Sequence, residues 1–406
     1  MTKVSSVAAR AHRADYVLAL AIFVLVSIGL VIIYSISPIL SQKLVGNADR
    51  NYYFMNQIKY VGIGLVVWIV ASQIRYDIWK RYAGLMLGVS IIGLLALLIP
   101  GISRASHGAT RWIDIGPFSI QPAEVMKIAL ILYLAAWFEK RSEDVRSFMD
   151  GVVPFMIMVG AASFVIVVFQ RDMGTMLVLA GAATAMFFTA GIRLRHLALL
   201  LGTFMAAGFA AIVAFPHRIG RVLTFLDPNK DASGTGYHIN QALIAIGSGG
   251  AFGVGLGHSI QVYGYLPEAA NDSIFAIIAE EFGLFGSYAI IVLFGFVVYR
   301  GLKVAQSAPD SFSRLTATGI SVWFGLQAAI NIGAMLSIVP LTGIPLPWIS
   351  YGGTSLIISM FGAGILLNIS KYTIREESHA NRSLRRGDSR AYNPNSSYQR
   401  RVKVAR

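Results

Sequence analysis

The stretch YVLALAIFVLVSIGLVIIYSI, residues 16–36, runs without a single charged side chain. As a helix it would be about 30 Å long, which matches the hydrocarbon thickness of a bilayer. The basic residues before it resemble the start of a cleaved signal peptide. The run is too long for one, however, and lacks a small-residue cleavage site, so we expect a retained first transmembrane helix.

Uncharged apolar runs of similar character continue along the chain. Together with the first they give ten candidate spans, near 15–37, 60–74, 83–100, 122–138, 151–169, 173–191, 197–215, 273–299, 316–338 and 350–370. Only Gln170, Arg171 and Asp172 separate the fifth from the sixth, so a count of nine is the alternative. A joined helix would place an Arg and an Asp at the bilayer centre, which is costly. The sequence therefore predicts an all-α polytopic membrane protein of about ten helices.

Composition and charge placement agree with this class. The 406 residues are 55% apolar and 13% charged, with a net charge of +14 and no cysteine, which excludes disulfides and thiolate chemistry. With ten spans both termini share one side, where 24 of the 34 lysines and arginines lie. The opposite side has 9, and Lys127 is inside a span. The positive-inside rule places both termini in the cytoplasm.

Three regions follow from this layout. Residues 1–14 form a cytoplasmic N-terminal tail, residues 15–370 a single membrane domain, and residues 371–406 a basic tail that we expect to be disordered. Between the seventh and eighth spans, residues 216–272 form a large extracytoplasmic loop, with six glycines between Gly247 and Gly257 that permit close backbone approach. The loop lacks the glycine spacing of nucleotide-binding motifs.

Ionisable residues in or beside spans are candidates for function. Glu124 and Lys127 are three residues apart on a helix that begins at Pro122, so they share a face and can form an ion pair, either structural or functional. Glu280 and Glu281 point about 100° apart around their helix, so at least one should face the interior.

A second group of candidates lies at the outward face. Asp172 and Asp272 start the sixth and eighth spans, where helix capping alone would explain a carboxylate. Their side of the membrane also carries the basic residues Arg111, Arg218 and Arg221. Acids and cations gathered at one face could hold a charged lipid headgroup and act on it.

Other polar and aromatic residues suggest no further site. The seven histidines show no metal-ligand spacing. Aromatic residues near span ends are expected to be membrane-interface anchors; these are Tyr34, Tyr60, Trp112 and Trp348. From the residues alone, the chain could be a transporter, a lipid-handling enzyme or a scaffold.

Four stretches carry a resemblance to a known family. They are GATRWIDIGPFSIQPAEVMK (108–127), QRDMGT (170–175), YHINQALIAIGSGGAFGVGLGHSIQVYGYLPEAANDSIFAIIAEEFGLFG (237–286) and VPLTGIPLPWISYGGTS (339–355). All four resemble the SEDS family of cell-wall polymerases, which includes FtsW, RodA and SpoVE. The 237–286 stretch is more similar to division-type FtsW, and an elongation role like that of RodA is the alternative.

The resemblance implies a peptidoglycan glycosyltransferase that polymerises lipid II at the outer face of the cytoplasmic membrane, at the division septum. It implies that Asp272 is catalytic, as the general base of an inverting displacement. Four positions depart from the family pattern: Val125, Arg171, Ser273 and Trp348. At Ser273 the family has Phe.

The remaining site residues expected to bind substrate are Glu124, Lys127, Asp172, Arg111, Arg218 and Arg221. No metal or cofactor is expected, although a divalent cation could share the neutralisation of the leaving diphosphate. The implied partners are a class B penicillin-binding protein transpeptidase and other division proteins. A lipid II flippase and a non-catalytic division scaffold remain the alternatives.

Overall fold

The computed structural model describes residues 12–45, 50–99, 103–106, 109–116, 118–141, 143–214, 216–227 and 234–374. Ten of its helices coincide with the ten predicted spans: α1 (Tyr16–Val45), α2 (Tyr52–Gln73), α3 (Tyr76–Ala96), α4 (Pro122–Lys140), α5 (Val153–Phe169), α6 (Met173–Thr189), α7 (Leu194–Val213), α10 (Ile274–Gln306), α11 (Ser311–Met335) and α12 (Gly353–Ser370). Helices α1, α2 and α10 extend well beyond their predicted runs, whereas α5, α6 and α12 are slightly shorter than theirs. The tail residues 375–406 lie outside the described part of the chain, so their predicted disorder stays a prediction.

Eight helices in the described ranges are long and apolar enough to cross a membrane, judged by length and composition. The two other predicted spans fall short for different reasons. Helix α6 is apolar but has 17 residues. Helix α4 carries charged residues, among them Glu124 and Lys127, that lower its hydropathy.

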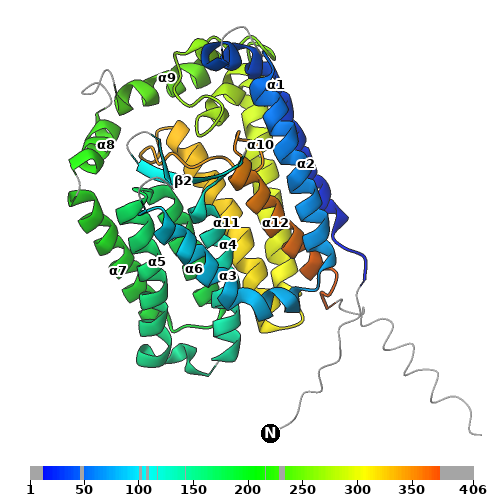
Figure 1. Cartoon of the computed structure of the whole chain (residues 1–406), viewed down its shortest axis with the longest axis vertical. Coiled ribbons are helices and arrows are strands. Elements are labelled where there is room, and N and C mark those ends of the chain that lie inside the picture. Colours follow the sequence, from blue (N-terminus) through cyan, green and yellow to red (C-terminus); the bar gives the residue numbers. More distant parts are fainter. Residues whose placement is uncertain are drawn as a thin grey trace, which may run out of the picture.

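The helices pack as a bundle in which α11 and α12 are the most enclosed and α7 lies at the rim (Figure 1). Helix α12 packs along α2, and α11 packs against both α10 and α6. The exposed faces of the outer helices are apolar, as expected where lipid replaces water.

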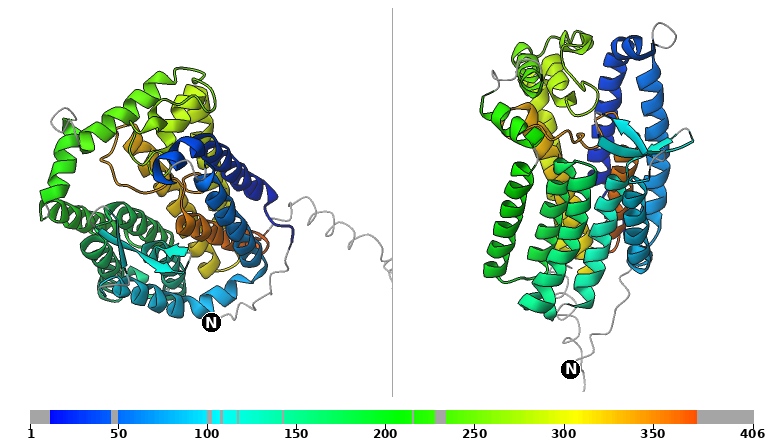
Figure 2. Two further views of the ribbon diagram at one scale, coloured as in Figure 1. Left: turned by 45° about the horizontal axis from the view of Figure 1, so that its top comes forward. Right: turned by 60° about the vertical axis from the view of Figure 1, so that its left-hand side comes forward.

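The end of the bundle that carries the 216–272 loop is built from short elements (Figures 1 and 2). The loop folds into α8 (Pro216–Leu226), α9 (Thr235–Ser248) and the short helix η5 (Gln261–Tyr263). Between α3 and α4 lies an antiparallel sheet in the order β1 (Ser103–Ser106), β2 (Ala109–Ile115) and β3 (Phe118–Ile120). The all-α prediction holds for the membrane part but did not anticipate this sheet.

Helix α10 is broken at Gly283, whose φ of 67° is outside the helical range. The break frees the carbonyls of Glu280 and Glu281, which accept hydrogen bonds from the backbone N–H groups of residues 254 and 255 at 2.9 and 3.1 Å. In return, the N–H groups of residues 284 and 285 donate to the carbonyls of residues 250 and 251. The glycine-rich loop therefore completes the hydrogen bonding of α10.

Close backbone approach in this loop requires glycine. A Cβ on Gly249 would lie 1.9 Å from the carbonyl oxygen of Ala279, and one on Gly253, which has a φ of +82°, would lie 2.1 Å from that of Glu281. The expectation that these glycines permit contact with a neighbouring helix is confirmed.

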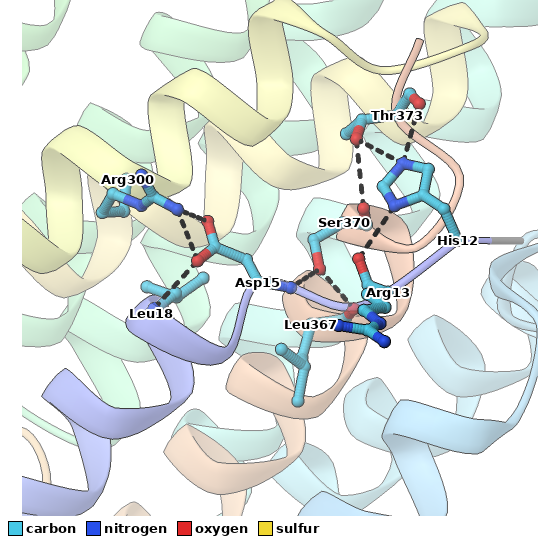
Figure 3. A network of polar contacts seen from close by, with 8 residues as sticks. All are labelled: His12, Arg13, Asp15, Leu18, Arg300, Leu367, Ser370 and Thr373. Atoms are coloured by element: carbon cyan, nitrogen blue, oxygen red, sulfur yellow. Dashed lines mark hydrogen bonds and ion pairs between the residues drawn. The ribbon is translucent and has the colours of Figure 1, made fainter. Parts of the chain in front are cut away.

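At the opposite end of the bundle, the residues before α1 are fixed against the end of α12 (Figure 3). Asp15 forms an ion pair with Arg300 of α10 at 2.6 Å, and its backbone N–H donates to Ser370 at 3.0 Å. The His12 ring contacts the Thr373 carbonyl at 2.9 Å. The two ends of the described chain therefore lie side by side, as an even number of spans predicts. We refer to residues 12–15, Arg300 and residues 370–373 as the terminal clasp.

The short elements on this side, within the described ranges, include the one-turn helix η2 (Asp144–Arg146) and the π-helical turn η3 (Phe148–Val152), which leads into α5. Helix α11 begins with a capping box in which Asp310 accepts from the Ser313 N–H at 2.8 Å.

Candidate functional site

A cavity of about 760 Å³ lies at the end of the bundle that carries α8, α9 and the sheet. Five of the predicted site residues line it, brought together from five separate elements of the chain: Arg111, Glu124, Asp172, Arg221 and Asp272. Its volume falls within the range of ligand-binding sites, about 300–1,000 Å³.

Asp272 is held through its backbone. The backbone N–H of Tyr351, the hydroxyl of Ser350 and the side-chain amide of Asn331 donate to the successive carbonyls of residues 270, 271 and 272, at 2.8, 2.6 and 2.7 Å. Because α11 and the chain before α12 fix these three groups, the Asp272 side chain is left free to face the cavity.

The carboxylate itself is not used for capping. Ser273 is the N-cap residue of α10, without a side-chain cap bond, and Asp272 Oδ1 is buried with no hydrogen-bond partner among the described residues. Capping, the alternative explanation for this residue, therefore does not account for the Asp272 carboxylate. A buried acceptor left unpaired costs free energy, which is typical of a group reserved for a ligand.

The surroundings of Asp272 also change its acidity. Desolvation and then the negative charge of Glu268 raise the pKa of Asp272 to about 7, while its backbone hydrogen bond, Arg221 and Arg111 act in the opposite direction. A carboxyl group with a pKa near the working pH is suited to accept a proton during a reaction.

Two of the predicted cations line the same cavity, but they differ in their contacts. Arg111 donates from Nε to the carbonyl of Gln170 at 3.0 Å and from Nη2 to that of Arg171 at 3.1 Å, so it closes the end of α5. Arg221 of α8 makes one long bond, 3.4 Å, to the Leu341 carbonyl. Desolvation and then the charge of Arg111 lower the pKa of Arg221, while Asp272 and Asp172 act to raise it. The side chain of Arg218, also in α8, lies outside the described residues.

Asp172 caps α6, as the sequence predicts. Its Oδ1 accepts from the Thr175 N–H at 2.9 Å and its Oδ2 from the Thr175 hydroxyl at 2.8 Å. Both carboxylate oxygens are therefore satisfied at the wall of the cavity.

Glu124 and Lys127 form the predicted ion pair at 2.8 Å, with both side chains buried. Lys127 also donates to Gln327 of α11 at 2.8 Å and lies 5.0 Å from the centre of the Trp323 ring. Glu124 reaches the cavity, and its Oε2 is buried with no partner in the part of the chain that the structure describes, whereas Lys127 is enclosed between α4 and α11. The pair therefore locks two helices and presents one carboxylate oxygen to the site.

Both Glu280 and Glu281 face the interior, where at least one was expected. Glu280 accepts from the Ser259 hydroxyl and the Ile260 N–H, and Glu281 from the Ser35 hydroxyl and the Gly257 N–H. These bonds fix the glycine-rich loop and α1 to α10. Neither residue lines the cavity.

Sequence reasoning missed several cavity residues. His238, Glu268 and Tyr351 line the cavity, and Tyr60 and Trp112, predicted as interface anchors, do so too. A useful signal was available for Glu268 and His238, since both lie within the 237–286 stretch on the outward side. Trp348, also predicted as an anchor, is buried at 2% exposure.

Among the described residues, no group of three or more histidine, aspartate or glutamate side chains could hold a metal ion. The expectation of no metal or cofactor stays a prediction.

Comparison with known proteins identifies this arrangement. Residues 16–375 match the family model that covers FtsW, RodA and SpoVE, described as "Cell cycle protein". The chain belongs to the FtsW/RodA/SpoVE family. Within this family, the chain is 38% identical to stage V sporulation protein E of Bacillus subtilis (strain 168) over 361 residues, 88% of this chain and 97% of that one.

A second relative in the FtsW/RodA/SpoVE family is the probable peptidoglycan glycosyltransferase FtsW of Thioalkalivibrio sulfidiphilus (strain HL-EbGR7). It is 38% identical over 373 residues, 90% of this chain and 91% of that one. The probable peptidoglycan glycosyltransferase FtsW of Trichlorobacter lovleyi is 39% identical over 359 residues, 88% of this chain and 93% of that one.

Solved structures give the same fold. A chain of a peptidoglycan synthase complex, described by its structural coordination of polymerization and crosslinking, matches with a TM-score of 0.71 at 26% identity, over 88% of this chain and 97% of that one. The rod shape determining protein RodA of Thermus thermophilus matches in fold with a TM-score of 0.64 at 24% identity, over 89% of this chain and 98% of that one.

The stretches that carry the FtsW/RodA/SpoVE resemblance converge on the cavity. Each of the four contributes to its wall, through Arg111 and Glu124, Asp172, Asp272, and Gly343 to Ser355. The four motifs therefore gather at this cavity, although they are far apart in the sequence.

Proposed function

We propose that the chain is a peptidoglycan glycosyltransferase of the division type, which polymerises lipid II into glycan strands at the outer face of the cytoplasmic membrane. Membership of the family and relatives that bear the name peptidoglycan glycosyltransferase FtsW support the activity. The observation that carries the chemistry is the Asp272 carboxylate, which faces the cavity with Oδ1 buried and without a partner within the described ranges.

In the proposed reaction, the 4-hydroxyl of one lipid-linked disaccharide attacks the anomeric carbon of another. A C–O bond forms, the bond from that carbon to the diphosphate breaks, and undecaprenyl diphosphate leaves with the electron pair. Asp272 accepts the hydroxyl proton as the attack proceeds, a contribution of about 10²–10⁴ in rate. A single displacement inverts the anomeric configuration.

The leaving group determines what else the site must do. Diphosphate leaves as an anion, so it needs cations rather than a second carboxylic acid. Arg221 is the better donor because its guanidinium makes one weak bond, while Arg111 already donates twice to backbone carbonyls. Arginine suits the task because its planar fork can donate two bonds to a phosphate.

The other predicted binding residues receive narrower roles. Glu124 can accept a bond from a sugar hydroxyl through Oε2, with Lys127 holding it in place. Asp172 shapes the wall, because its two oxygens are already paired with Thr175.

The lipid II flippase is the main alternative. A flippase needs polar groups near the bilayer midplane along its path. Inside the bundle, Lys127 is instead enclosed and bonded to Gln327, and its ion-pair partner Glu124 faces the cavity. This arrangement favours a fixed site at the outer end over a path through the protein.

The proposed partner is a class B penicillin-binding protein transpeptidase, together with other proteins of the division septum. The similarity to a chain of a peptidoglycan synthase complex supports an assembly that couples polymerisation to crosslinking. Septal location follows from the division-type resemblance.

The test is glycan production from purified lipid II in detergent, with and without a partner transpeptidase. We expect Asp272→Asn to abolish polymerisation while the protein remains folded, and wild-type activity to rise from pH 5.5 to 8 with a midpoint near 7, because the base must be ionised. Asp77→Asn removes an exposed carboxylate at the start of α3, outside the cavity lining, and should retain activity. Full activity of Asp272→Asn would refute the assignment.

A further inference from the structure

His238 lies beside the segment that carries Asp272. It belongs to α9, lines the cavity, and its Nε2 is 2.6 Å from the Oγ of Ser273. Ser273 is completely buried, and its hydroxyl donates to the Pro267 carbonyl at 2.8 Å. A serine hydroxyl has one proton to give. Since that proton goes to Pro267, the bond from His238 must be Nε2–H donating to Ser273, which fixes the tautomer of the ring.

Two hydrogen bonds from Ser273 back to the start of the segment 267–273 hold that segment in a closed loop. The Ser273 backbone N–H donates to the Glu268 carbonyl at 3.2 Å, while its hydroxyl holds the carbonyl of Pro267. Glu268 has a φ of +51°, a conformation that non-glycine residues rarely adopt and that the surrounding bonds must hold in place. Asp272 immediately precedes Ser273, so the bonds made by Ser273 also determine where the Asp272 carboxylate lies.

The position of Ser273 departs from the family pattern noted above, where the residue is Phe. An apolar ring can be held by packing alone, but a buried hydroxyl needs hydrogen-bond partners. In this chain the bonds to His238 and Pro267 provide them. The histidine and the serine therefore form a matched pair.

The ring of His238 supplies this bond without adding a charge. Desolvation lowers its pKa to about 4, Arg221 of α8 acts in the same direction, and Glu268 of the 267–273 segment opposes them. Arg111 of β2 and Arg221 already act to lower the pKa of Asp272. An imidazolium beside Asp272 would lower it further and make the carboxylate a weaker base.

We propose that His238 is a positioning residue for Asp272, which it holds in place through Ser273 and the closed 267–273 segment. The inference rests on the proposed function, because it takes Asp272 as the base of the polymerisation. It assigns α9, and thus the large outer loop, a direct part in setting the geometry of the reaction.

The experiment measures kcat, KM and the pH profile of glycan polymerisation from purified lipid II for four variants and one control. We expect His238→Ala and Ser273→Ala each to lower kcat by about 10- to 100-fold, with KM changed less than about threefold, because a shift of about 1 Å in a catalytic group has an effect of this order. The acid limb of the profile should move to lower pH by about one unit, since a looser segment admits water to Asp272.

Two further variants separate positioning from bulk stability. His238→Gln keeps an N–H donor of similar reach and should retain at least about a third of the wild-type kcat. The combination of His238→Ala with Ser273→Ala should be no worse than the poorer single variant, because residues that act through one bond are not additive. His258→Ala is the matched control, since that histidine is exposed and its ring contacts the Leu256 carbonyl of its own loop at 3.1 Å.

Specific results would overturn the inference. It fails if His238→Ala keeps wild-type kcat and the wild-type acid limb, if His238→Gln is as impaired as His238→Ala, or if the two alanine losses multiply. Unfolding temperatures of the purified variants identify any protein that is merely misfolded. If His238→Ala is misfolded, the kinetics of His238→Gln and Ser273→Ala test the positioning role instead. A wild-type protein that makes no glycan from lipid II would instead refute the proposed function.

Discussion

Replacing Asp272 by Asn should stabilise the protein at alkaline pH, although it removes activity. The pKa of Asp272 is raised from 3.8 to about 7 in the folded protein. The folded state therefore binds this proton more tightly than the unfolded state. Its stabilising effect is fully present below pH 3.8 and is lost as the pH rises through 7.

The size of this effect follows from the difference in pKa. About three pH units at about 1.4 kcal/mol each give about 4 kcal/mol of lost stability at pH 8, of which about 2 kcal/mol is already lost at pH 5.5. The Asn side chain has the same shape and no charge to desolvate. The advantage of Asp272→Asn over wild type should therefore grow by about 2 kcal/mol between pH 5.5 and pH 8.

Equilibrium unfolding of both proteins in mixed detergent micelles at the two pH values measures this difference. Comparing the change with pH cancels any constant effect of the amide group. Asp114→Asn, which alters an exposed carboxylate, should show no such growth. An equal gap between Asp272→Asn and wild type at pH 5.5 and pH 8 would show that the carboxyl group ionises near its ordinary pKa, and the case for a base tuned to neutral pH would be lost.

Two other predictions concern the scaffold. Gly249→Ala should strongly reduce the yield of folded protein, because its Cβ would lie 1.9 Å from a backbone oxygen of α10; Gly247→Ala, with open space around it, should be tolerated, as expression and unfolding temperature will show. Asp15→Asn should lower the free energy of unfolding by about 2 kcal/mol, because Arg300 loses a charged partner. Asp77→Asn breaks an exposed ion pair instead and should change stability by less than about 1 kcal/mol. Equal effects of the two aspartate variants, or of the two glycine variants, would contradict these expectations.

Hydropathy and charge were enough to predict the bundle. Apolar length predicts helices in lipid because unpaired backbone groups are excluded there, and the Lys and Arg distribution predicts the orientation. The sheet between α3 and α4 was missed, since its strands are short and the segment is too polar to be read as a span. The break at Gly283 was also missed, because the residues that repair the hydrogen bonds of α10 are about thirty positions earlier in the chain.

The site was predictable to the level of charged residues. Asp272, Asp172 and Glu124 were identified because placing a charged group in or beside a membrane span costs free energy. The cavity brings the three residues together. Their individual roles depend on the folded structure: the hydrogen-bond partners distinguish Asp172, which caps a helix, from Asp272, which does not. Uncharged supports such as Asn331 carry no comparable signal, because an amide in a span has many structural uses.

Trp348 shows the same limit for aromatic residues. A tryptophan near a span end predicts a membrane-interface anchor, yet this ring is buried, 4.5 Å from Phe324 and 6.0 Å from Phe294 between ring centres. Its backbone φ of +62° turns the chain sharply before α12. Tertiary packing determines the position of the ring, and this packing cannot be predicted from hydropathy.

The terminal clasp and the cavity lie at opposite ends of one helix, α12. Its last residue, Ser370, belongs to the clasp, and its first residue, Gly353, lines the cavity. A helix of 18 residues is about 27 Å long and is stiff along its axis. Helix α12 is therefore a direct structural link between the clasp, where the two ends of the described chain meet, and the cavity wall near Asp272.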